Sequence, residues 1–173
     1  PADGNRFTFC VVAQNLSDPV KNVAMAVEVF RELKKAYPHI SLALVGNNGD
    51  SFLGDGITAL GSLAEEEMAQ MLSHTSSLIV PSLAENSPLV IAEAAARGTA
   101  SIVNSVGGMP DMVASLEAGN IFSNGGELHE SMVPVAQKDD HISPALREAL
   151  SARAITLFSP ASVSQQYDDL YSV

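Results

Sequence analysis

Short apolar runs alternate with amphipathic segments along the chain. Residues 7–13, 41–46 and 77–81 are largely apolar, as is typical of strands that are buried on both faces of a sheet. Between the first two runs, residues 22–36 carry apolar side chains at helical spacing with charged side chains on the other side, and Pro38 follows. The pattern therefore predicts a helix between two buried strands.

The same alternation continues to the end of the chain. Ser62 and Glu65 form a Ser-x-x-Glu capping box, which predicts a helix that runs to His74. The further predicted strands are 57–60, 100–104 and 120–123. The further predicted helices are 89–97, a short one within "VGGMPDMV", 144–158 and 161–171, whereas 124–144 is predicted to be irregular. No repeat or second core is visible, so we predict one α/β domain, a Rossmann-like doubly wound parallel sheet with helices on both faces.

Polar and glycine-containing segments follow each predicted strand. In open parallel sheets, ligands bind in the crevice at the carboxyl ends of the strands, so these segments are the place to look for a site. They are 14–21, 46–48, 60–61, 82–88 and 104–110. All of them fall on one edge of the predicted sheet. A nucleotide site would need this arrangement, although any doubly wound domain places its loops there.

Two carboxylates, Glu85 and Glu93, flank a Ser-Pro step in an otherwise apolar stretch. Ser87 is a suitable N-cap and Pro88 suits the first helical position, so a helix is predicted to start here. The free amides of its first turn would form an anion site. Glu85 would lie in the loop and Glu93 in the second turn, both facing one crevice. Because carboxylates accept hydrogen bonds from hydroxyl groups, this arrangement suits a ligand with phosphates and hydroxyls, such as a nucleotide sugar.

Lys21 stands at the end of segment 14–21, which follows the first predicted strand, and directly before a predicted helix. A cation is unfavourable at a helix N-terminus unless it meets an anion, and a lysine there could neutralise a diphosphate. A surface lysine is the alternative interpretation. Glu85 could likewise be a turn residue, and Glu93 could be solvated, but Glu93 stands in a helix that is apolar nearly all round. An unpaired buried carboxylate would be costly there, which favours a functional role.

Charge and composition exclude several classes of function. The formal net charge of −11 argues against a nucleic-acid surface and against broad docking on anionic lipid. The single cysteine, Cys10, lies in an apolar run, so a buried reduced thiol is predicted and a disulfide framework is excluded. The four histidines lack the spacing of a metal site, and the glycine-rich segment 46–56 lacks the Gly-Lys-Ser/Thr of a phosphate-binding loop. No apolar run is long enough to span a membrane, and no secretory signal is visible.

The segment "VPSLAENSPLVIAEAAARGTASIVNSVGGMPDMV" resembles the Glu-x7-Glu signature and the following strand of retaining glycosyltransferases of family 4. The "VVAQNLSDPVKN" segment is similar to the loop of that family that carries an arginine and a lysine, and "FSPASVSQQYDDLYSV" is similar to its closing helix. The matching positions are Pro81, Ser82, Glu85, Pro88, Glu93, Ala94, Ala96 and Gly98. The resemblance covers essentially the whole chain and implies the C-terminal half of a GT-B fold.

The resemblance implies a role for each matching residue. Glu93 would bind the ribose hydroxyls. The two expected catalytic residues are Glu85, which would contact the donor sugar near the reacting carbon, and Lys21, which would hold the diphosphate. Gln14 stands where the family usually has an arginine, so one of the two diphosphate cations is missing or replaced. The remaining expected donor-binding residues are Asn86, Ser87, Pro88, Leu89 and Val90 around the phosphates and sugar, and Gly46, Asn47 and Leu60 around the base.

The resemblance also implies what the whole enzyme does. It would transfer a hexose from a UDP- or GDP-sugar to a hydroxyl of a glycan or lipid-linked acceptor, in polysaccharide or glycoconjugate biosynthesis, without a metal or other cofactor. Because the chain lacks an initiator Met, residues 1–173 are expected to be the donor-binding half without its acceptor domain, and inactive alone. A cytoplasmic enzyme is expected, either free or held at the inner face of the membrane by the missing half. A nucleotide-sugar epimerase half and a non-catalytic flavodoxin-like interaction domain are the alternatives.

Overall fold

The computed structural model describes residues 6–138 and 143–171. The strands are β1 (Phe7–Asn15), β2 (Leu42–Asn47), β3 (Ile57–Gly61), β4 (Thr75–Val80), β5 (Ala100–Asn104) and β6 (Gly119–Phe122). The α-helices are α1 (Val23–Ala36), α2 (Glu65–Ser73), α3 (Leu89–Ala96), α4 (Met109–Leu116), α5 (Gly125–Ala136), α6 (Pro144–Phe158) and α7 (Pro160–Tyr171). Two 3-10 turns, η1 (Pro19–Lys21) and η2 (Gly49–Phe52), lie between β1 and α1 and between β2 and β3.

The six named strands form one sheet in the order β3-β2-β1-β4-β5-β6, and all neighbours are parallel. In the centre, Cys10 of β1 pairs with Ala43 of β2 on one side and with Leu78 of β4 on the other. The chain thus winds outward from β1 in one direction and outward from β4 in the other. This confirms the predicted doubly wound parallel sheet and puts its topological switch point between β1 and β4.

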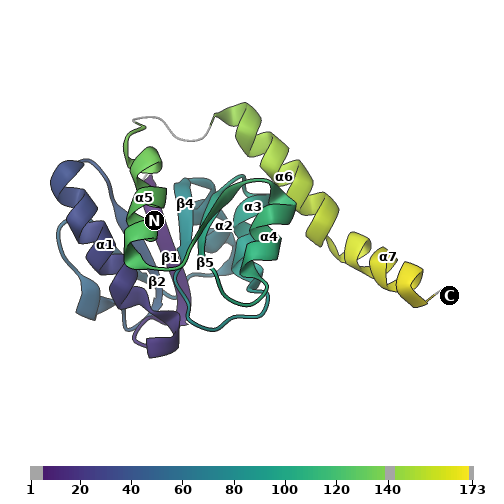
Figure 1. Cartoon of the computed structure of the whole chain (residues 1–173), viewed down its shortest axis with the longest axis horizontal. Helices are drawn as coiled ribbons and strands as arrows, with labels where there is room; N and C mark the ends of the chain where they lie inside the picture. Colours follow the sequence, from purple (N-terminus) through teal and green to yellow (C-terminus); the bar gives the residue numbers. More distant parts are fainter. Residues whose placement is uncertain (1–5, 139–142, 172–173) are drawn as a thin grey trace.

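Helices cover both faces of the sheet (Figure 1). Buried apolar residues of α1 and α5 pack on one face, and those of α2, α3 and α4 pack on the other, where α6 lies against α3 and α4. α7 extends from the end of α6, away from the sheet (Figure 1). η1 and η2 follow the carboxyl ends of β1 and β2, and a loop follows that of β4.

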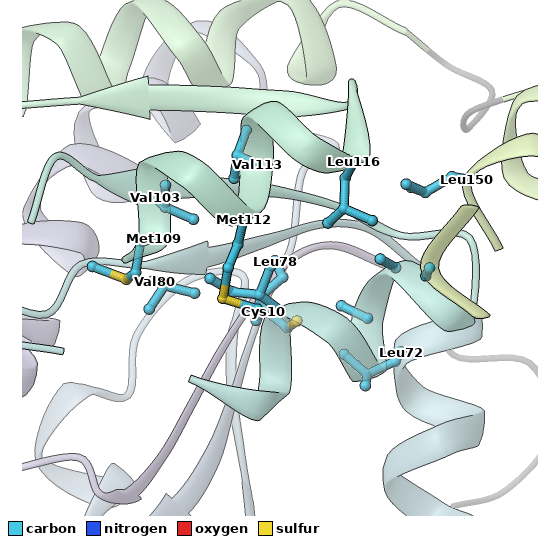
Figure 2. Close-up of a cluster of buried hydrophobic side chains, with 14 of the residues drawn as sticks. Cys10, Leu72, Leu78, Val80, Val103, Met109, Met112, Val113, Leu116 and Leu150 are labelled. Atoms are coloured by element: carbon cyan, nitrogen blue, oxygen red, sulfur yellow. The ribbon is translucent and has the colours of Figure 1, made fainter. Parts of the chain in front are cut away.

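The strand side chains alternate between the two cores. Leu78 and Val80 of β4 join the cluster under α4, while Ile79 points into the cluster under α1 and α5. Figure 2 shows Met109 and Met112 of α4 together with Leu78 and Val80 of β4 and Cys10. Burial raises the pKa of the Cys10 thiol to about 12. The thiol therefore stays protonated and inert at neutral pH, as the sequence predicted.

The structure contradicts the irregular segment predicted at 124–144, because α5 occupies most of it; 139–142 lie outside the described residues. Asn124 caps α5 by accepting a hydrogen bond from the Glu127 amide at 3.0 Å. Glu127 in turn accepts one from the Ser123 amide at 2.7 Å. The glycines at the start of the helix and Pro134 inside it obscure the pattern. The buried side chains are Leu128, Met132 and Ala136, one every four residues.

The capping box predicted at Ser62 is also wrong. α2 begins two residues later than the box requires, with Ala64 at the N-cap. The side chain of Glu67 accepts a hydrogen bond from the Ala64 amide at 2.8 Å, but Ala64 has no side-chain acceptor to complete the reciprocal pair. Ser62 instead donates a hydrogen bond to Asn47 Oδ1 at 3.2 Å. The serine thus joins the end of β3 to the end of β2.

Ser101 in β5 carries the one buried side-chain polar atom without a hydrogen-bond partner in the described part of the chain. Replacing Ser101 with alanine is therefore expected to raise the free energy of unfolding by about 1 kcal/mol, because an unpaired hydroxyl is removed from the core. Urea denaturation measures the change. Ser77→Ala is the control, because its hydroxyl donates to Ala100 O at 3.2 Å, and the free energy of unfolding should fall. Equal losses in both variants would contradict the assignment.

Candidate functional site

Lys21 and Glu85 form an ion pair across the switch point of the sheet. Lys21 ends η1, which follows β1, and Glu85 lies in the loop that follows β4. Lys21 Nζ contacts Glu85 Oε1 directly, and the two side chains keep 30% and 19% of their surface exposed. Ser82 donates a hydrogen bond to the same carboxylate oxygen at 3.2 Å. The sequence predicted both residues on this edge, and the structure brings them into contact.

Local backbone interactions fix the position of Lys21. Asp18 caps η1 by accepting a hydrogen bond from the Val20 amide at 2.9 Å. Asn22 then takes a left-handed conformation with φ of 51°, which turns the chain into α1. The carbonyl of Val20 accepts a hydrogen bond from the Leu83 amide at 2.7 Å. The loop that carries Lys21 is thereby tied to the loop that carries Glu85.

The Gly107-Gly108 turn supports the Glu85 loop from the β5 side. Gly107 has φ of +56°, and a Cβ atom on it would lie 1.7 Å from Glu85 O. The Gly108 amide donates a hydrogen bond to Asn86 O at 2.7 Å. Only glycine permits this close approach of the two backbones. The turn therefore does more than connect β5 to α4, because it holds the loop that presents the carboxylate.

The start of α3 differs from the prediction. Pro88, with φ of −69° and ψ of 120°, is the N-cap, and no side chain caps the helix. Ser87 was predicted to be the cap, but its hydroxyl points to Met112 Sδ at 3.3 Å. The extended ψ of Pro88 moves the first helical residue to Leu89, which is 75% exposed. The first turn of α3 thus has no side-chain cap at the point where the loop after β4 leads into the helix.

Glu93 lies in a groove, and the expectation that it is buried is wrong. Its side chain is exposed and lines this groove together with residues of α2. The groove has a volume of about 660 Å³. It lies between α2, α3 and α6, and besides Glu93 it is lined by Leu63, Glu65, Met68, Ala69, Leu72, Ala96, Arg97 and Ile155. Apart from Glu93, none of these lining residues was predicted from the sequence to belong to the site; of them, only Leu63 lies in the connection just beyond the end of β3, where the position relative to the strand could have indicated it.

The other predicted donor-binding residues lie on the β1–β2–β3 side of the rim. Gln14 is exposed and belongs to β1, not to the loop after it. Gly46 has φ of +134°, and a Cβ atom on it would lie 1.7 Å from Ala13 O, so β2 ends tightly against β1. Asn47 is exposed and bonded to Ser62, and Leu60 is half-buried. The hydrogen bonds described on this side do not connect these residues to the Lys21–Glu85 pair.

Two further features of the described residues bear on the site. Within 6–138 and 143–171, no group of three or more His, Cys, Asp or Glu side chains is placed to hold a metal ion. In the same ranges, none of the helices combines the length and the apolarity that crossing a bilayer requires. Metal-independent chemistry stays a prediction.

The family model described as glycosyl transferases group 1 matches residues 6–137. The chain belongs to the group 1 glycosyltransferases. Comparison with curated protein sequences gives no match. The fold is that of a GT-B glycosyltransferase domain, as three solved structures that resemble it show.

A sucrose-phosphate synthase from Thermosynechococcus elongatus shares 24% identity with the glycosyltransferase domain, over 99% of this chain and 46% of that one, with a TM-score of 0.75. AviGT4, a glycosyltransferase involved in avilamycin A biosynthesis, shares 16% identity over 96% of this chain and 51% of its own, with a TM-score of 0.68. A chain of the GtfA/B complex shares 14% identity over 97% of this chain and 36% of its own length, with a TM-score of 0.71. The domain thus spans about half or less of each of these chains.

Proposed function

We propose that this domain binds the nucleoside diphosphate sugar donor of a retaining glycosyltransferase of family 4. The observation that carries the proposal is the Lys21–Glu85 pair at the switch point between β1 and β4. A lysine and a carboxylate at the carboxyl edge of such a sheet provide one group for phosphates and one for sugar hydroxyls. The Glu93 groove beside α3 provides room for a nucleoside.

Each part of the donor has a place in this proposal. The diphosphate lies between Lys21 and the start of α3, where first-turn amides favour an anion. The hexose hydroxyls face Glu85, and the ribose hydroxyls bind Glu93. The base enters the groove, whose apolar lining includes Leu63 and Met68. The donor therefore lies along α3, with its diphosphate at the first turn and its ribose at the second.

The proposed catalytic role of Lys21 follows from the negative charge that develops during sugar transfer. As the bond between the anomeric carbon and the phosphate oxygen breaks, negative charge grows on the leaving diphosphate. Lys21 and the amides of α3 stabilise this charge, and a preorganised group of this kind is a large part of catalysis. Glu85 orients the hexose at the reacting carbon. The acceptor oxygen then bonds to the anomeric carbon with retained configuration as its proton passes to the leaving diphosphate, and no metal or other cofactor is required.

The scope of the proposal extends to the whole enzyme. A UDP- or GDP-hexose is the donor, and a hydroxyl of a glycan or lipid-linked acceptor receives the sugar in polysaccharide or glycoconjugate biosynthesis. A second domain supplies the acceptor site, so residues 1–173 bind the donor without transferring sugar. The enzyme works in the cytoplasm, where the second domain provides any contact with the membrane. Appreciable sugar transfer by the 173-residue chain alone would contradict this division.

Glu93→Ala tests the assignment of the ribose. The variant is expected to lose about tenfold in affinity for a nucleoside diphosphate, because hydrogen bonds to a charged group are lost. Thermal shift and calorimetric titration with UDP, GDP and ADP measure this loss. Glu66→Ala removes the same charge from an exposed position of α2 and serves as the control. Wild-type affinity in Glu93→Ala would show that the ribose lies elsewhere.

A further inference from the structure

Asn104 is a buried amide at the end of β5, 7% exposed, that lies beside the Glu85 loop. Its Nδ2 donates a hydrogen bond to Ser82 O at 3.0 Å. Its Oδ1 accepts one from the Ser105 amide at 2.9 Å. One partner can only accept and the other can only donate, so the orientation of the amide is determined. The side chain is thus a fixed link between β5 and the segment that follows β4.

The link stands where the backbone ladder between β4 and β5 stops. Val80 and Val103 are the last pair in register. Pro81 comes next and has no N–H group to donate, so the regular ladder cannot continue through it. The Asn104 side chain reaches one residue further and bonds to the carbonyl of Ser82. It replaces a missing backbone interaction at the point where the rim loop begins.

The residue that Asn104 holds is itself bonded to the carboxylate of the proposed site. Ser82 Oγ donates to Glu85 Oε1, which also meets Lys21. We propose that Asn104 is a positioning residue that fixes Glu85 in the donor site through Ser82. The proposal rests on the proposed function, because it assigns to Asn104 the placement of a carboxylate that binds the sugar. Asn104 itself touches neither the donor nor the reacting atoms.

Other contacts confine the expected effect to one part of the loop. Leu83 is bonded to Val20, and Asn86 is bonded to Gly108, so the loop stays attached at two further points when Asn104 is changed. The Ser82 carbonyl alone loses its link to β5. A shift at Ser82 moves the Glu85 carboxylate, whereas Lys21 remains on its own turn. Contacts with the hexose should therefore weaken more than contacts with the diphosphate.

The first experiment needs no ligand. Amide hydrogen exchange is measured in the wild-type 173-residue chain, in Asn104→Asp and in Asn104→Ala. Asp keeps the acceptor for the Ser105 amide but loses the donor to Ser82. In both variants, exchange at Leu83 is expected to accelerate by about tenfold relative to Leu78 in β4, because local opening becomes easier. Glu66→Ala changes an exposed position of α2, which neither pairs with β4 nor belongs to the loop, and should leave this ratio unchanged. An unchanged ratio in the Asn104 variants would overturn the proposal.

The second experiment compares UDP with UDP-glucose and GDP with GDP-mannose by calorimetric titration. Asn104→Ala is expected to bind the sugar nucleotide about threefold to tenfold more weakly and the nucleoside diphosphate within about twofold of wild type. Equal losses for both ligands would indicate a merely structural role and overturn the proposal. If Asn104→Ala fails to fold, Asn104→Ser replaces it. Failure of the wild type to bind any of the four ligands would instead contradict the proposed function, while the exchange experiment still decides whether Asn104 holds the loop.

Discussion

Replacing Gly107 with alanine is expected to weaken the binding of a nucleoside diphosphate sugar by at least about a hundredfold. The new Cβ atom would lie 1.7 Å from Glu85 O, so the two backbones must separate. The residue also keeps φ of +56°, which is unfavourable for alanine. Moving the Glu85 backbone breaks the contacts with both Lys21 and Ser82. The affinity should therefore fall by more than it does in a variant that carries a similar backbone strain away from this loop.

Gly56→Ala is the matched control for this variant. Gly56 has φ of +72°, so alanine there bears a similar conformational penalty. The two atoms nearest to an added Cβ belong to the flexible end of the Lys34 side chain, and the backbone atom Ile40 O lies at 3.1 Å rather than 1.7 Å. Gly56 lies at the amino edge of the sheet, directly before β3. Calorimetric titration should show near wild-type affinity in Gly56→Ala. Wild-type affinity in a folded Gly107→Ala chain would mean that the donor does not depend on the Glu85 loop.

Replacing Lys21 with methionine is expected to lower the affinity for a nucleoside diphosphate by about a hundredfold. Methionine preserves much of the apolar stem but removes the charge that meets the phosphates. Glu85 is then left without a cation and repels the incoming anion. Both effects act in the same direction, so this substitution should have the largest effect of any single charge change on the rim.

The salt dependence of binding tests the electrostatic explanation. Affinity in the wild type should fall as ionic strength rises, and this dependence should be weaker in Lys21→Met. Lys35→Met removes an exposed lysine that pairs with Glu32 in α1, and it should bind the donor as the wild type does. If Lys35→Met and Lys21→Met lose affinity equally, the phosphates respond to the total charge of the domain and not to Lys21.

Much of the fold could be predicted from the sequence because its strands are apolar and its helices are regularly spaced between them. Alternation specified the parallel sheet, but it did not specify which strand lies beside which. The place of β1 between β2 and β4 depends on how the crossovers pack, and it is this neighbourhood that puts Lys21 against Glu85. The rule that ligands bind at the carboxyl ends of parallel strands indicated the right edge of the sheet. Tertiary packing then brought Lys21 and Glu85 together.

The errors arose where several local patterns competed. Ser62 and Ser87 are both acceptable cap residues, but the N-cap of α2 is Ala64, two residues after Ser62, and the N-cap of α3 is Pro88, one residue after Ser87. α5 was missed because glycines and a proline occur in a segment that is nevertheless held by its cap and by packing on α1. Glu93 was expected to be buried because its neighbours are apolar, yet it faces an open groove. The link from Asn104 to Ser82 joins the end of β5 to a loop residue 22 positions earlier in the chain, and no local pattern reveals it.

A crystal structure of the chain with a UDP- or GDP-hexose bound is the most direct test of the central claim. The proposal predicts a diphosphate oxygen about 2.8 Å from Lys21 Nζ, as in a charge-assisted hydrogen bond. It also predicts the hexose hydroxyls against Glu85 and the ribose against Glu93. A donor whose diphosphate lies away from Lys21, or whose ribose lies outside the groove between α2 and α3, would contradict the account.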